Sequence, residues 1–378
     1  MGFKVVFLTN QASYHQMDYA RAMVACLGVD NFRIVFQKPT SDARAEMGWQ
    51  DDYRDACIIR WWKSDADQAL AREWIATADV VLQGRFPINE VRKRIRQGRL
   101  TIACQERLWK RAPNWLRRVS RLPHLYKNYY SVDVANYHFF AIGAFAAADL
   151  RGLGVFANRM WQFGYFIDAP DYPEKLQSDV PIQLLWCARL SAVKQPIKAV
   201  HMLRDLLKKG LDCHLTLIGD GDLRTAVAAE IDRLGLASSI DMVGWQTQDQ
   251  VREHMARADL FIMTSHHGEG WGMVVNEAMS YGCCVLANQE LGAAAWLVED
   301  EVTGFLYDDQ HVSEVVDRIA NLTRDQLQAM GRAGHQRMHQ QWSAKVAADR
   351  TVALSNALLN QDLGVARALF PDGPCSPL

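Results

Sequence analysis

HHGEGWGMVVNEAMSYGCCVLA, residues 266–287, follows an apolar run of strand length, ADLFIMTS, and ends in another such run. Between the two runs, a glycine-rich turn leads into the helix-like segment MVVNEAMSYG, which Gly282 ends. This order predicts strand, turn, helix and strand, the repeating unit of a parallel sheet. Glu269 lies in the turn and Glu277 in the helix, so the stretch places a carboxylate on each side of a helix N-terminus.

The same alternation extends over both halves of the chain. Strand-length apolar runs occupy residues 4–9, 32–37, 57–62, 79–84 and 100–105 in the first half, and residues 182–190, 213–220, 239–245, 259–265 and 283–288 in the second. Helix-like segments separate these runs, and 378 residues are too many for one core of ordinary size. The sequence therefore predicts an α/β protein with two Rossmann-like parallel-sheet domains facing a central cleft.

The domain boundaries are read from interruptions in this alternation. Prolines weaken the pattern after residue 106, and residues 165–181 are polar and broken by prolines, which is typical of a connection between domains. We expect an N-terminal domain over residues 1–168, a C-terminal domain over 169–345, and a C-terminal helix with a tail over 346–378. The helix is expected to be able to pack back on the N-terminal domain, and the tail to be poorly ordered.

Composition narrows the class of protein. The chain is 49% hydrophobic and 22% charged, with a formal net charge of −1. Eight cysteines are scattered without a CxxC pair, which favours reduced thiols over a metal or catalytic site. MGFKVVFLTN reads as a first strand rather than a secretory signal, and the apolar stretch FFAIGAFAAADL is too short to span a bilayer. We therefore expect a cytoplasmic protein.

The turn and helix of the opening stretch predict a site for an anion. The first amides of a helix, near Gly272, Met273 and Val274, have no intrahelical partner and lie at the positive end of the helix dipole. Gly270 and Gly272 allow close approach of the backbone to a phosphate. Alternatively, the turn glutamate caps the helix electrostatically and the helix glutamate is a solvated surface acid.

Two further stretches favour the anion site. CARLSAVKQP places Arg189 and Lys194 after the first strand of the second domain, where two cations can neutralise a diphosphate. LIGDGDLR contains Asp220 and Asp222, which superficially form a metal-binding DxD pair. Their place between a strand and a helix instead favours turn and helix-cap roles.

Together, these motifs resemble those of the retaining glycosyltransferases of family 4, which have the GT-B fold. ARLSAVK resembles that family's GRL-x-x-x-K, and LIGDGDLR its glycine-rich L-x-x-x-G-x-G motif. EGWGMVVNEAMSYGCCVLA resembles its block of two glutamates separated by seven residues, and EVTGFLYD its D-G-x-T-G-F-L. The resemblance covers about residues 182–310 and is much thinner in the N-terminal domain.

The resemblance implies a function for each domain. The N-terminal domain would bind an acceptor and the C-terminal domain a nucleotide-sugar donor, with Glu269, Arg189 and Lys194 as catalytic residues. The implied donor-binding residues are Arg189, Lys194, Gly270, Trp271, Gly272, Met273, Val274 and Glu277, the last contacting the ribose. Transfer would retain the anomeric configuration and need no metal or other cofactor. The donor is expected to be UDP-linked, and the acceptor a glycan or lipid-linked saccharide of cell-envelope polysaccharide or glycolipid synthesis.

Two departures from the family pattern concern the sugar and the acceptor. Where the family often has a Gly-Gly loop after the first strand, this chain has Asn10, His15 and Gln16, which we expect at the cleft. The histidine could contact the donor phosphate or the acceptor hydroxyl, or merely begin a helix. Trp296 stands where a glutamate is usual. The adjacent His266 and His267 are not expected to converge on one metal ion.

A basic segment predicts a second kind of contact. Residues 85–127 hold thirteen Lys or Arg and two acids, a local charge of +11. Within this segment, residues 105–127 interleave Arg and Lys with Trp and Leu, which predicts docking on an anionic membrane surface at the inner face of the cell membrane. The alternative is a solvated basic face whose apolar side chains pack on the domain core. Nucleic-acid binding is not expected, because the overall pI is about 6.8 and the motifs lie in the other domain.

Two other functions fit the same motifs. One is a nucleotide-sugar epimerase of GT-B architecture, and the other is a non-catalytic nucleotide-sugar-binding partner of a transferase. The paired glutamates together with Arg189 and Lys194 favour the transferase.

Overall fold

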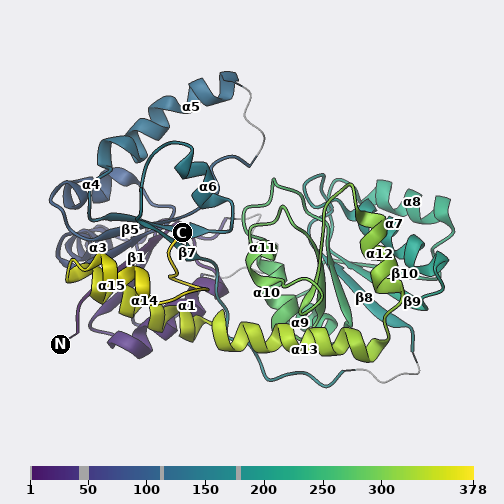
Figure 1. Ribbon diagram of the computed structural model, residues 1–378. Coiled ribbons are helices and arrows are strands. Elements are labelled where there is room, and N and C mark those ends of the chain that lie inside the picture. Colours follow the sequence, from purple (N-terminus) through teal and green to yellow (C-terminus); the bar gives the residue numbers. More distant parts are fainter. Residues whose placement is uncertain (1, 42–50, 111–114, 176–179) are drawn as a thin grey trace. The chain divides into compact units, whose positions relative to one another are not determined.

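The computed structural model describes residues 2–41, 51–110, 115–175 and 180–378 (Figure 1). These residues form two compact units. Unit 1 contains residues 1–168 and 341–378, and unit 2 contains residues 169–340. The chain thus returns to unit 1 at Gln341, ahead of the boundary at 345 that the sequence suggested.

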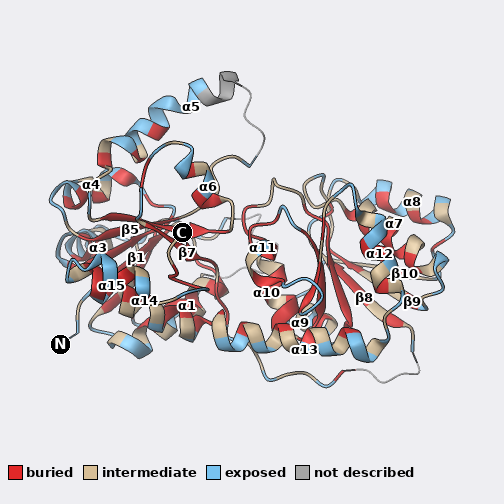
Figure 2. Cartoon of the chain, in the orientation of Figure 1, coloured by how far each residue is buried: buried red, intermediate tan, exposed pale blue. Residues whose placement is uncertain are grey.

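Unit 1 is built on a seven-stranded sheet in which every pair of neighbouring strands is parallel. The strand order is β3-β2-β1-β4-β5-β6-β7. The strands are β1 (Val5–Thr9), β2 (Phe32–Phe36), β3 (Ile58–Arg60), β4 (Val80–Gln83), β5 (Thr101–Glu106), β6 (Tyr137–Ile142) and β7 (Met160–Phe163). Every residue of β1, β4 and β6 is buried (Figure 2), as expected for a parallel sheet covered on both faces.

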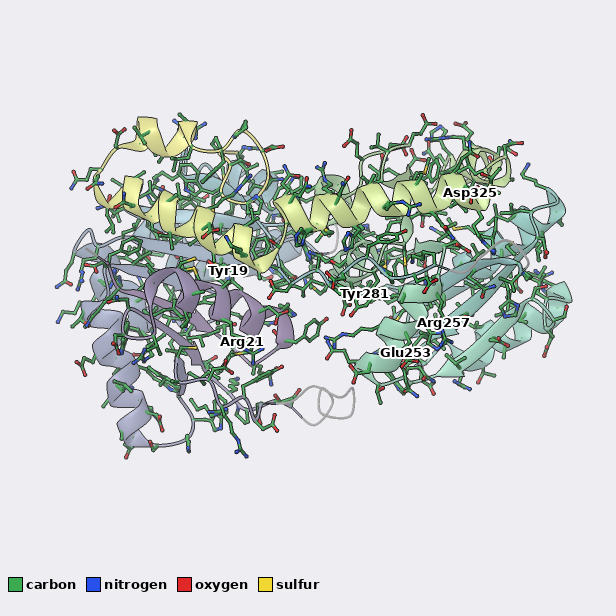
Figure 3. All side chains as sticks on the ribbon, turned by 90° about the horizontal axis from the view of Figure 1, so that it is seen from below. Tyr19, Arg21, Glu253, Arg257, Tyr281 and Asp325 are labelled. Carbon is green, nitrogen blue, oxygen red and sulfur yellow. The ribbon has the colours of Figure 1, made fainter. Side chains whose placement is uncertain are left out.

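The helices of unit 1 come from both ends of the chain. They are α1 (Tyr14–Leu27), α3 (Asp65–Thr77), α4 (Ile88–Arg96), α5 (Trp115–Asn128), the 3₁₀ helix η1 (Tyr130–Val132), α6 (Ala146–Arg151), α14 (Ala344–Leu359) and α15 (Leu363–Ala368). Tyr19 of α1, which Figure 3 labels, donates a hydrogen bond of 2.9 Å to the hydroxyl of Thr351 on α14. Phe166 stacks on Trp342, just before α14, with ring centroids 6.2 Å apart. A buried hydroxyl contact therefore joins α14 to α1, and a buried aromatic contact joins the start of α14 to the segment after β7.

The expectation of a poorly ordered C-terminal tail is wrong. The amide of Cys375 donates to the carbonyl of Gln162 at 2.7 Å, and the amide of Gln162 donates to Ser376 at 2.8 Å. The amide of Leu378 then donates to the carbonyl of Met160 at 3.0 Å. These bonds lay the tail along the edge strand β7, whose backbone groups would otherwise lack partners.

The helix α5 also differs from expectation. Pro113 and Pro123 would normally limit a helix in this region to short pieces, but α5 runs for 14 residues with Pro123 inside it. A proline removes one hydrogen bond to the carbonyl four residues earlier, here that of Val119. Val119 is 54% exposed, so water can reach this position. The other proline, Pro113, lies outside the described residues.

Unit 2 repeats the architecture with six parallel strands. The strand order is β10-β9-β8-β11-β12-β13. The strands are β8 (Ile182–Cys187), β9 (Cys213–Ile218), β10 (Ile240–Gly244), β11 (Leu260–Met263), β12 (Cys284–Asn288) and β13 (Gly304–Tyr307). The helices are α7 (Pro196–Lys208), α8 (Arg224–Leu234), α9 (Gln248–Arg257), α10 (Met273–Ser280), α11 (Ala294–Leu297), α12 (Val312–Ala320) and α13 (Arg324–Gln341), whose last residue belongs to unit 1.

The strand order of unit 2 places its binding site. The chain winds outward from β8 to β10 in one direction and from β11 to β13 in the other, so the order reverses between β8 and β11. Ligands of doubly wound sheets bind at the carboxyl ends of the strands at such a reversal. Residues 188–195 follow β8 and residues 264–272 follow β11 at this edge.

Two features concern the whole described chain. All eight cysteines are free thiols, and six of them are buried. Among the described residues, no helix is both long enough and apolar enough to cross a membrane.

Candidate active site

The loop that carries Arg189 is held by the backbone of the neighbouring strand connection. The amide of Leu190 donates to the carbonyl of Asp220 at 2.9 Å. A Cβ atom on Gly219 would lie 2.0 Å from the carbonyl oxygen of Ala188, and one on Gly221 only 2.6 Å from that of Leu190. The two glycines of LIGDGDLR are therefore required for the close approach of two loops, and this approach places the exposed Arg189 at the switch point.

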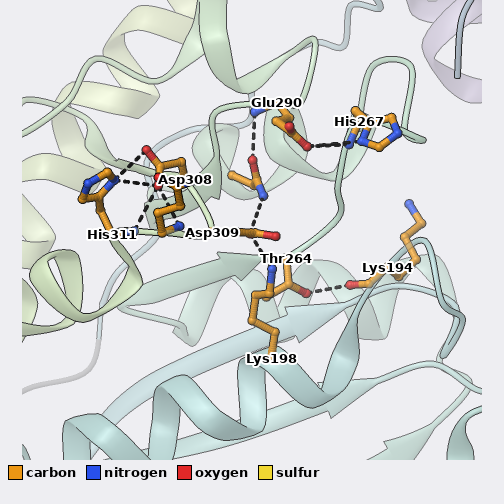
Figure 4. Close-up of polar contacts among 10 residues, drawn as sticks. Lys194, Lys198, Thr264, His267, Glu290, Asp308, Asp309 and His311 are labelled. Atoms are coloured by element: carbon orange, nitrogen blue, oxygen red, sulfur yellow. Dashed lines mark hydrogen bonds and ion pairs between the residues drawn. The ribbon is translucent and has the colours of Figure 1, made fainter. Parts of the chain in front are cut away.

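Lys194 reaches the same edge and forms an ion pair with Glu269. The two side chains are 22% and 21% exposed, respectively. The backbone behind the lysine is fixed, because Thr264 donates a 2.6 Å hydrogen bond to its carbonyl (Figure 4). Trp186 in turn donates a 2.8 Å bond to the threonine hydroxyl. The structure thus brings together two of the residues predicted to be catalytic.

The turn between β11 and α10 presents a helix N-terminus to this pair. Gly272, the N-cap, has a φ of 95°, in the left-handed region. Met273 and Val274 are the first two residues of the eight-residue helix α10, so their amides have no carbonyl partner within that helix. The side chain of Trp271 is buried and donates to Asn276 at 2.7 Å. We therefore expect Trp271 to contact a donor only through its main chain, as Gly270 must.

The helix α10 is also held at its other end. The ammonium group of Lys175 donates to the carbonyls of Met255, Ala258 and Tyr281 at 3.2, 2.8 and 2.9 Å. The last of these residues is the C-cap of α10, where a cation is favourable. Burial lowers the pKa of Lys175. This lysine, which the sequence analysis did not single out, fixes the helix that carries the N-terminal amides.

Glu277 lies in the second turn of α10 and is partly buried. It is close enough to Cys187, the last residue of β8, that burial together with its negative charge raises the pKa of that thiol to about 12. Glu277 therefore lies near the end of the strand that leads to Arg189 and Lys194. The two cations, the helix N-terminus and the two carboxylates of the predicted donor site thus lie at one edge of unit 2.

A polar network beside this site was missed by sequence reasoning. His267 donates its amide hydrogen to Glu290 at 3.2 Å, and Asn288 bonds Asp309 at 3.2 Å (Figure 4). Lys198 pairs with the same aspartate at 2.6 Å. Lys198 lies on α7, and the other residues lie at or just after the carboxyl ends of β11, β12 and β13. Their proximity therefore depends on the strand order and could not be read from local sequence.

Of the two aspartates weighed as a metal pair, Asp220 has other partners. The carboxylate of Asp220 accepts from the amide of Gly221 at 2.7 Å and from Arg224 at 3.3 Å, which confirms its turn role. Asp222 is exposed, and the N-cap of α8 is Leu223 with no side-chain capping bond, so the helix-cap role is wrong. Across the part of the chain that the structure describes, no group of three or more His, Cys, Asp or Glu residues could hold a metal ion.

Adjacent to the turn, His266 accepts a hydrogen bond from the amide of Gly268 at 3.0 Å through Nδ1. Burial and the neighbouring His267 lower the pKa of His266. Trp296, which stands where the family has a glutamate, packs edge-on against Trp271 with ring centroids 6.2 Å apart.

The residues predicted for the acceptor lie in unit 1, at the carboxyl end of β1. His15 is 8% exposed and hydrogen-bonds Ser13 at 3.0 Å. Gln16 donates to the hydroxyl of Thr9 at 2.7 Å, and Asn10 follows that threonine directly. These side chains are thus organised at the edge of the unit 1 sheet where its strand order also reverses, between β1 and β4.

Residues 168–338, slightly less than half of the chain, match the family model described as "Glycosyl transferases group 1". The amylovoran biosynthesis glycosyltransferase AmsK of Erwinia amylovora is 30% identical over 131 residues, which cover 33% of this chain and 32% of that protein. The GDP-mannose-dependent alpha-(1-6)-phosphatidylinositol monomannoside mannosyltransferase of Mycobacterium tuberculosis is 32% identical over 136 residues, covering 34% and 35%. The chain thus matches about a third of the length of these curated relatives.

A solved structure resembles nearly the whole chain. The crystal structure of Anabaena Alr3699/HepE in complex with UDP superposes with a TM-score of 0.63 at 16% identity. The likeness covers 94% of this chain and 100% of that one. It confirms the fold expected from the motifs, the GT-B architecture of two Rossmann-like domains.

Proposed function

Starting from the match of residues 168–338 to the glycosyl transferases group 1 family model, we propose that this protein is a retaining glycosyltransferase. It moves a sugar from a nucleoside diphosphate to a hydroxyl of a glycan or lipid-linked saccharide. One observation carries the proposal: two cations, a helix N-terminus and two carboxylates converge at the switch point of unit 2. The names of the amylovoran and phosphatidylinositol mannoside relatives favour an acceptor of cell-envelope polysaccharide or glycolipid synthesis.

Each side chain has a distinct task in this proposal. The diphosphate lies against the amides of Met273 and Val274, and Arg189 and Lys194 neutralise it. Glu277 accepts the ribose hydroxyls. A bound diphosphate offers the lysine an anionic partner other than Glu269, which leaves that carboxylate to orient the hydroxyls of the transferred sugar.

The reaction exchanges one bond at the anomeric carbon. The bond from C1 to the β-phosphate oxygen breaks, and a bond from C1 to the acceptor oxygen forms on the same face. The acceptor proton passes to the departing phosphate, so the products are the glycoside and the nucleoside diphosphate. Arg189, Lys194 and the helix N-terminus stabilise the charge that develops on the diphosphate. We expect this set to suffice without a metal, so activity should persist in excess EDTA.

The first prediction concerns nucleotide affinity. We expect Glu277→Ala and Arg189→Ala each to weaken binding of the preferred nucleoside diphosphate by roughly tenfold or more, because each removes a charge-assisted hydrogen bond worth about 1.5–3 kcal/mol. Glu269→Ala should leave this affinity nearly unchanged, because its proposed partner is the sugar. Titration calorimetry with UDP, GDP and ADP identifies the base, for which we expect uridine, and measures each variant.

The exposed Asp222 provides the matched control, since it lies in the neighbouring loop outside the proposed contacts. Asp222→Ala should bind as the unchanged protein does. Equal affinities in Glu277→Ala, Arg189→Ala and Asp222→Ala would place the donor elsewhere. A product formed from the nucleotide sugar without any acceptor, with the sugar still attached to its nucleotide, would instead indicate an epimerase.

We also propose that α5 docks on an anionic membrane surface from the cytoplasmic side. Val119, Leu122 and Tyr126 lie three and four residues apart on one stripe of this helix and are 54%, 55% and 66% exposed. Leu125 lies on another side of the helix and is buried. An exposed apolar stripe on a basic helix suits insertion at the boundary between lipid headgroups and acyl chains.

Fewer cations of residues 85–127 are available to a membrane than the local charge of +11 suggested. Arg94 is buried and donates hydrogen bonds to backbone carbonyls, including that of Ile75 at 2.7 Å. Arg107 pairs with Asp149 at 3.6 Å. The side chains of Trp115, Leu116, Arg117 and Arg118 lie outside the description. Arg121 and Lys127 remain exposed cations on α5, and each contributes about 1 kcal/mol near an anionic surface.

The second prediction tests the stripe. The protein should co-sediment with vesicles containing phosphatidylglycerol at low salt and be released as salt is added, because salt screens the charges. Leu122→Glu should abolish co-sedimentation, because a carboxylate replaces an apolar contact and repels the anionic surface. Leu70→Glu, at an exposed leucine on α3, is the matched control and should bind normally. Equal recovery with neutral and anionic vesicles would refute docking.

A further inference from the structure

We propose that Lys110, Glu106, Tyr165 and His15 of unit 1 form a subsite for a neutral saccharide ring, the acceptor end of the reaction. This inference rests on the proposed transferase function and adds the chemical class of the acceptor group and the residues that recognise it. Three of these residues were not candidates on sequence grounds. The four residues come from three separate segments of the chain, and the fold brings these segments together.

Glu106 is the centre of the subsite. It is the last residue of β5, at the carboxyl edge of the sheet. One carboxylate oxygen accepts from the hydroxyl of Tyr165 at 3.0 Å, and the other pairs with the ammonium of Lys110 at 2.5 Å. A carboxylate has about four acceptor positions, and the contacts among the described residues use two of them, which leaves two for a ligand. The side chain is 26% exposed, which keeps those positions accessible.

Tyr165 extends the subsite toward the acceptor residues read from the sequence. It follows β7 by two residues and is partly buried. Its ring packs against that of His15 with centroids 4.6 Å apart, and the histidine in turn bonds Ser13 at 3.0 Å. A carboxylate, an aromatic ring and an imidazole therefore lie in contact at one edge of unit 1.

The loop that carries Lys110 is fixed before any ligand binds. The amide of Trp109 donates to Asp149 of α6 at 3.1 Å. Arg121 of α5 donates to the carbonyl of Leu108 at 2.8 Å and lies over the Trp109 ring at 5.3 Å. The subsite is therefore joined through this loop to α5, the proposed membrane-docking helix, as a lipid-linked acceptor requires.

The chemistry of the cluster selects a neutral sugar. Free carboxylate positions accept hydroxyl hydrogens, and an aromatic face covers the apolar C–H face of a sugar ring. A phosphate would face the negative charge of Glu106, and Lys110, the cation that the described part of the chain pairs with this carboxylate, is already engaged. A neutral polyol ring satisfies the free positions without such repulsion.

The test compares two probes that share the glucose ring and differ in charge, methyl glucoside and glucose 6-phosphate. Methyl galactoside and methyl mannoside serve as stereochemical alternatives. Saturation-transfer NMR on the full chain should detect at least one methyl glycoside at millimolar concentration and not the phosphate. Glu106→Ala should weaken the detected glycoside at least tenfold, as expected for loss of charge-assisted hydrogen bonds. Glu106→Gln keeps the shape of the side chain and should admit the phosphate.

Glu90→Ala, at a surface glutamate paired with Arg72, is the matched control and should bind as the unchanged protein does. The inference is overturned if no neutral methyl glycoside binds, if glucose 6-phosphate binds as well as the glycoside, or if Glu106→Ala and Glu106→Gln behave like Glu90→Ala. Calorimetry with nucleoside diphosphates on the same samples tests the proposed function separately, because the proposed nucleotide site lies in unit 2. Nucleotide binding without glycoside binding would overturn only the subsite, whereas loss of nucleotide binding would count against the transferase function.

Discussion

Lys194→Ala is expected to lower the turnover number of sugar transfer by roughly 10²–10³-fold, the effect of removing one preorganised group that stabilises developing charge. The lysine lies at the carboxyl edge of β8, and Thr264 and Trp186 fix its backbone. Its ion pair with Glu269 holds the ammonium where a departing diphosphate would lie. Steady-state kinetics with the donor found by calorimetry, in excess EDTA, measure the loss.

Lys198→Ala is the matched control for this effect. Lys198 lies four residues further along the chain at the same edge of unit 2 but pairs with Asp309 at 2.6 Å. Its removal should change turnover only slightly, because no step of the proposed reaction uses it. Turnover in Lys194→Ala within a few-fold of that in Lys198→Ala would contradict the assignment. A complete loss of wild-type activity in EDTA, restored by Mg²⁺ or Mn²⁺, would contradict the metal-independent mechanism.

Gly219→Ala is expected to reduce the free energy of unfolding of unit 2 by ~3 kcal/mol or more and to abolish nucleotide binding. The added Cβ would lie 2.0 Å from the carbonyl oxygen of Ala188, and the φ of 124° is unfavourable for any residue with a side chain. Either the loop before Arg189 must move or the strand connection must shift. Urea unfolding followed by tryptophan fluorescence and nucleotide calorimetry measure the two effects.

A second glycine separates the steric effect from backbone strain. Gly235, at the C-cap of α8, has a φ of 67°, but an added Cβ would meet nothing within 4 Å. Gly235→Ala should therefore lose only about 1–2 kcal/mol, the penalty of the left-handed conformation itself. Nucleotide binding should survive in this control. Equal stability and equal binding in Gly219→Ala and Gly235→Ala would show that the close contact of the two loops has no role.

Some of the fold could be predicted because its signals are local. All ten strand-length runs of the sequence coincide with strands of the two sheets, from Val5–Thr9 to Cys284–Asn288. Buried parallel strands must be continuously apolar, and short apolar runs between turns show this directly. The strands β6, β7 and β13 lie in stretches to which the sequence analysis assigned no strand. The tail was misjudged because its order comes from β7, more than 200 residues away in the sequence.

Some of the site could be predicted for the same reason. Glu269, Gly272 and Glu277 lie within one turn and one helix, so their spacing alone places them around a helix N-terminus. Arg189 and Lys194 follow a recognisable strand, and strand ends of a parallel sheet share an edge. These inferences depend on period and spacing, which the sequence contains without reference to any distant residue.

The sequence by itself determined the alternation of strands and helices, the helix N-terminus flanked by two carboxylates, and the pair of cations after β8. Only the tertiary structure decided which of these groups touch. The pairing of Lys194 with Glu269 spans 75 residues, and that of Tyr165 with Glu106 spans 59. Each depends on the order in which strands enter a sheet. Hydrophobic periodicity specifies that a strand is buried, but the order follows from packing of the whole unit, and so it is absent from any local pattern.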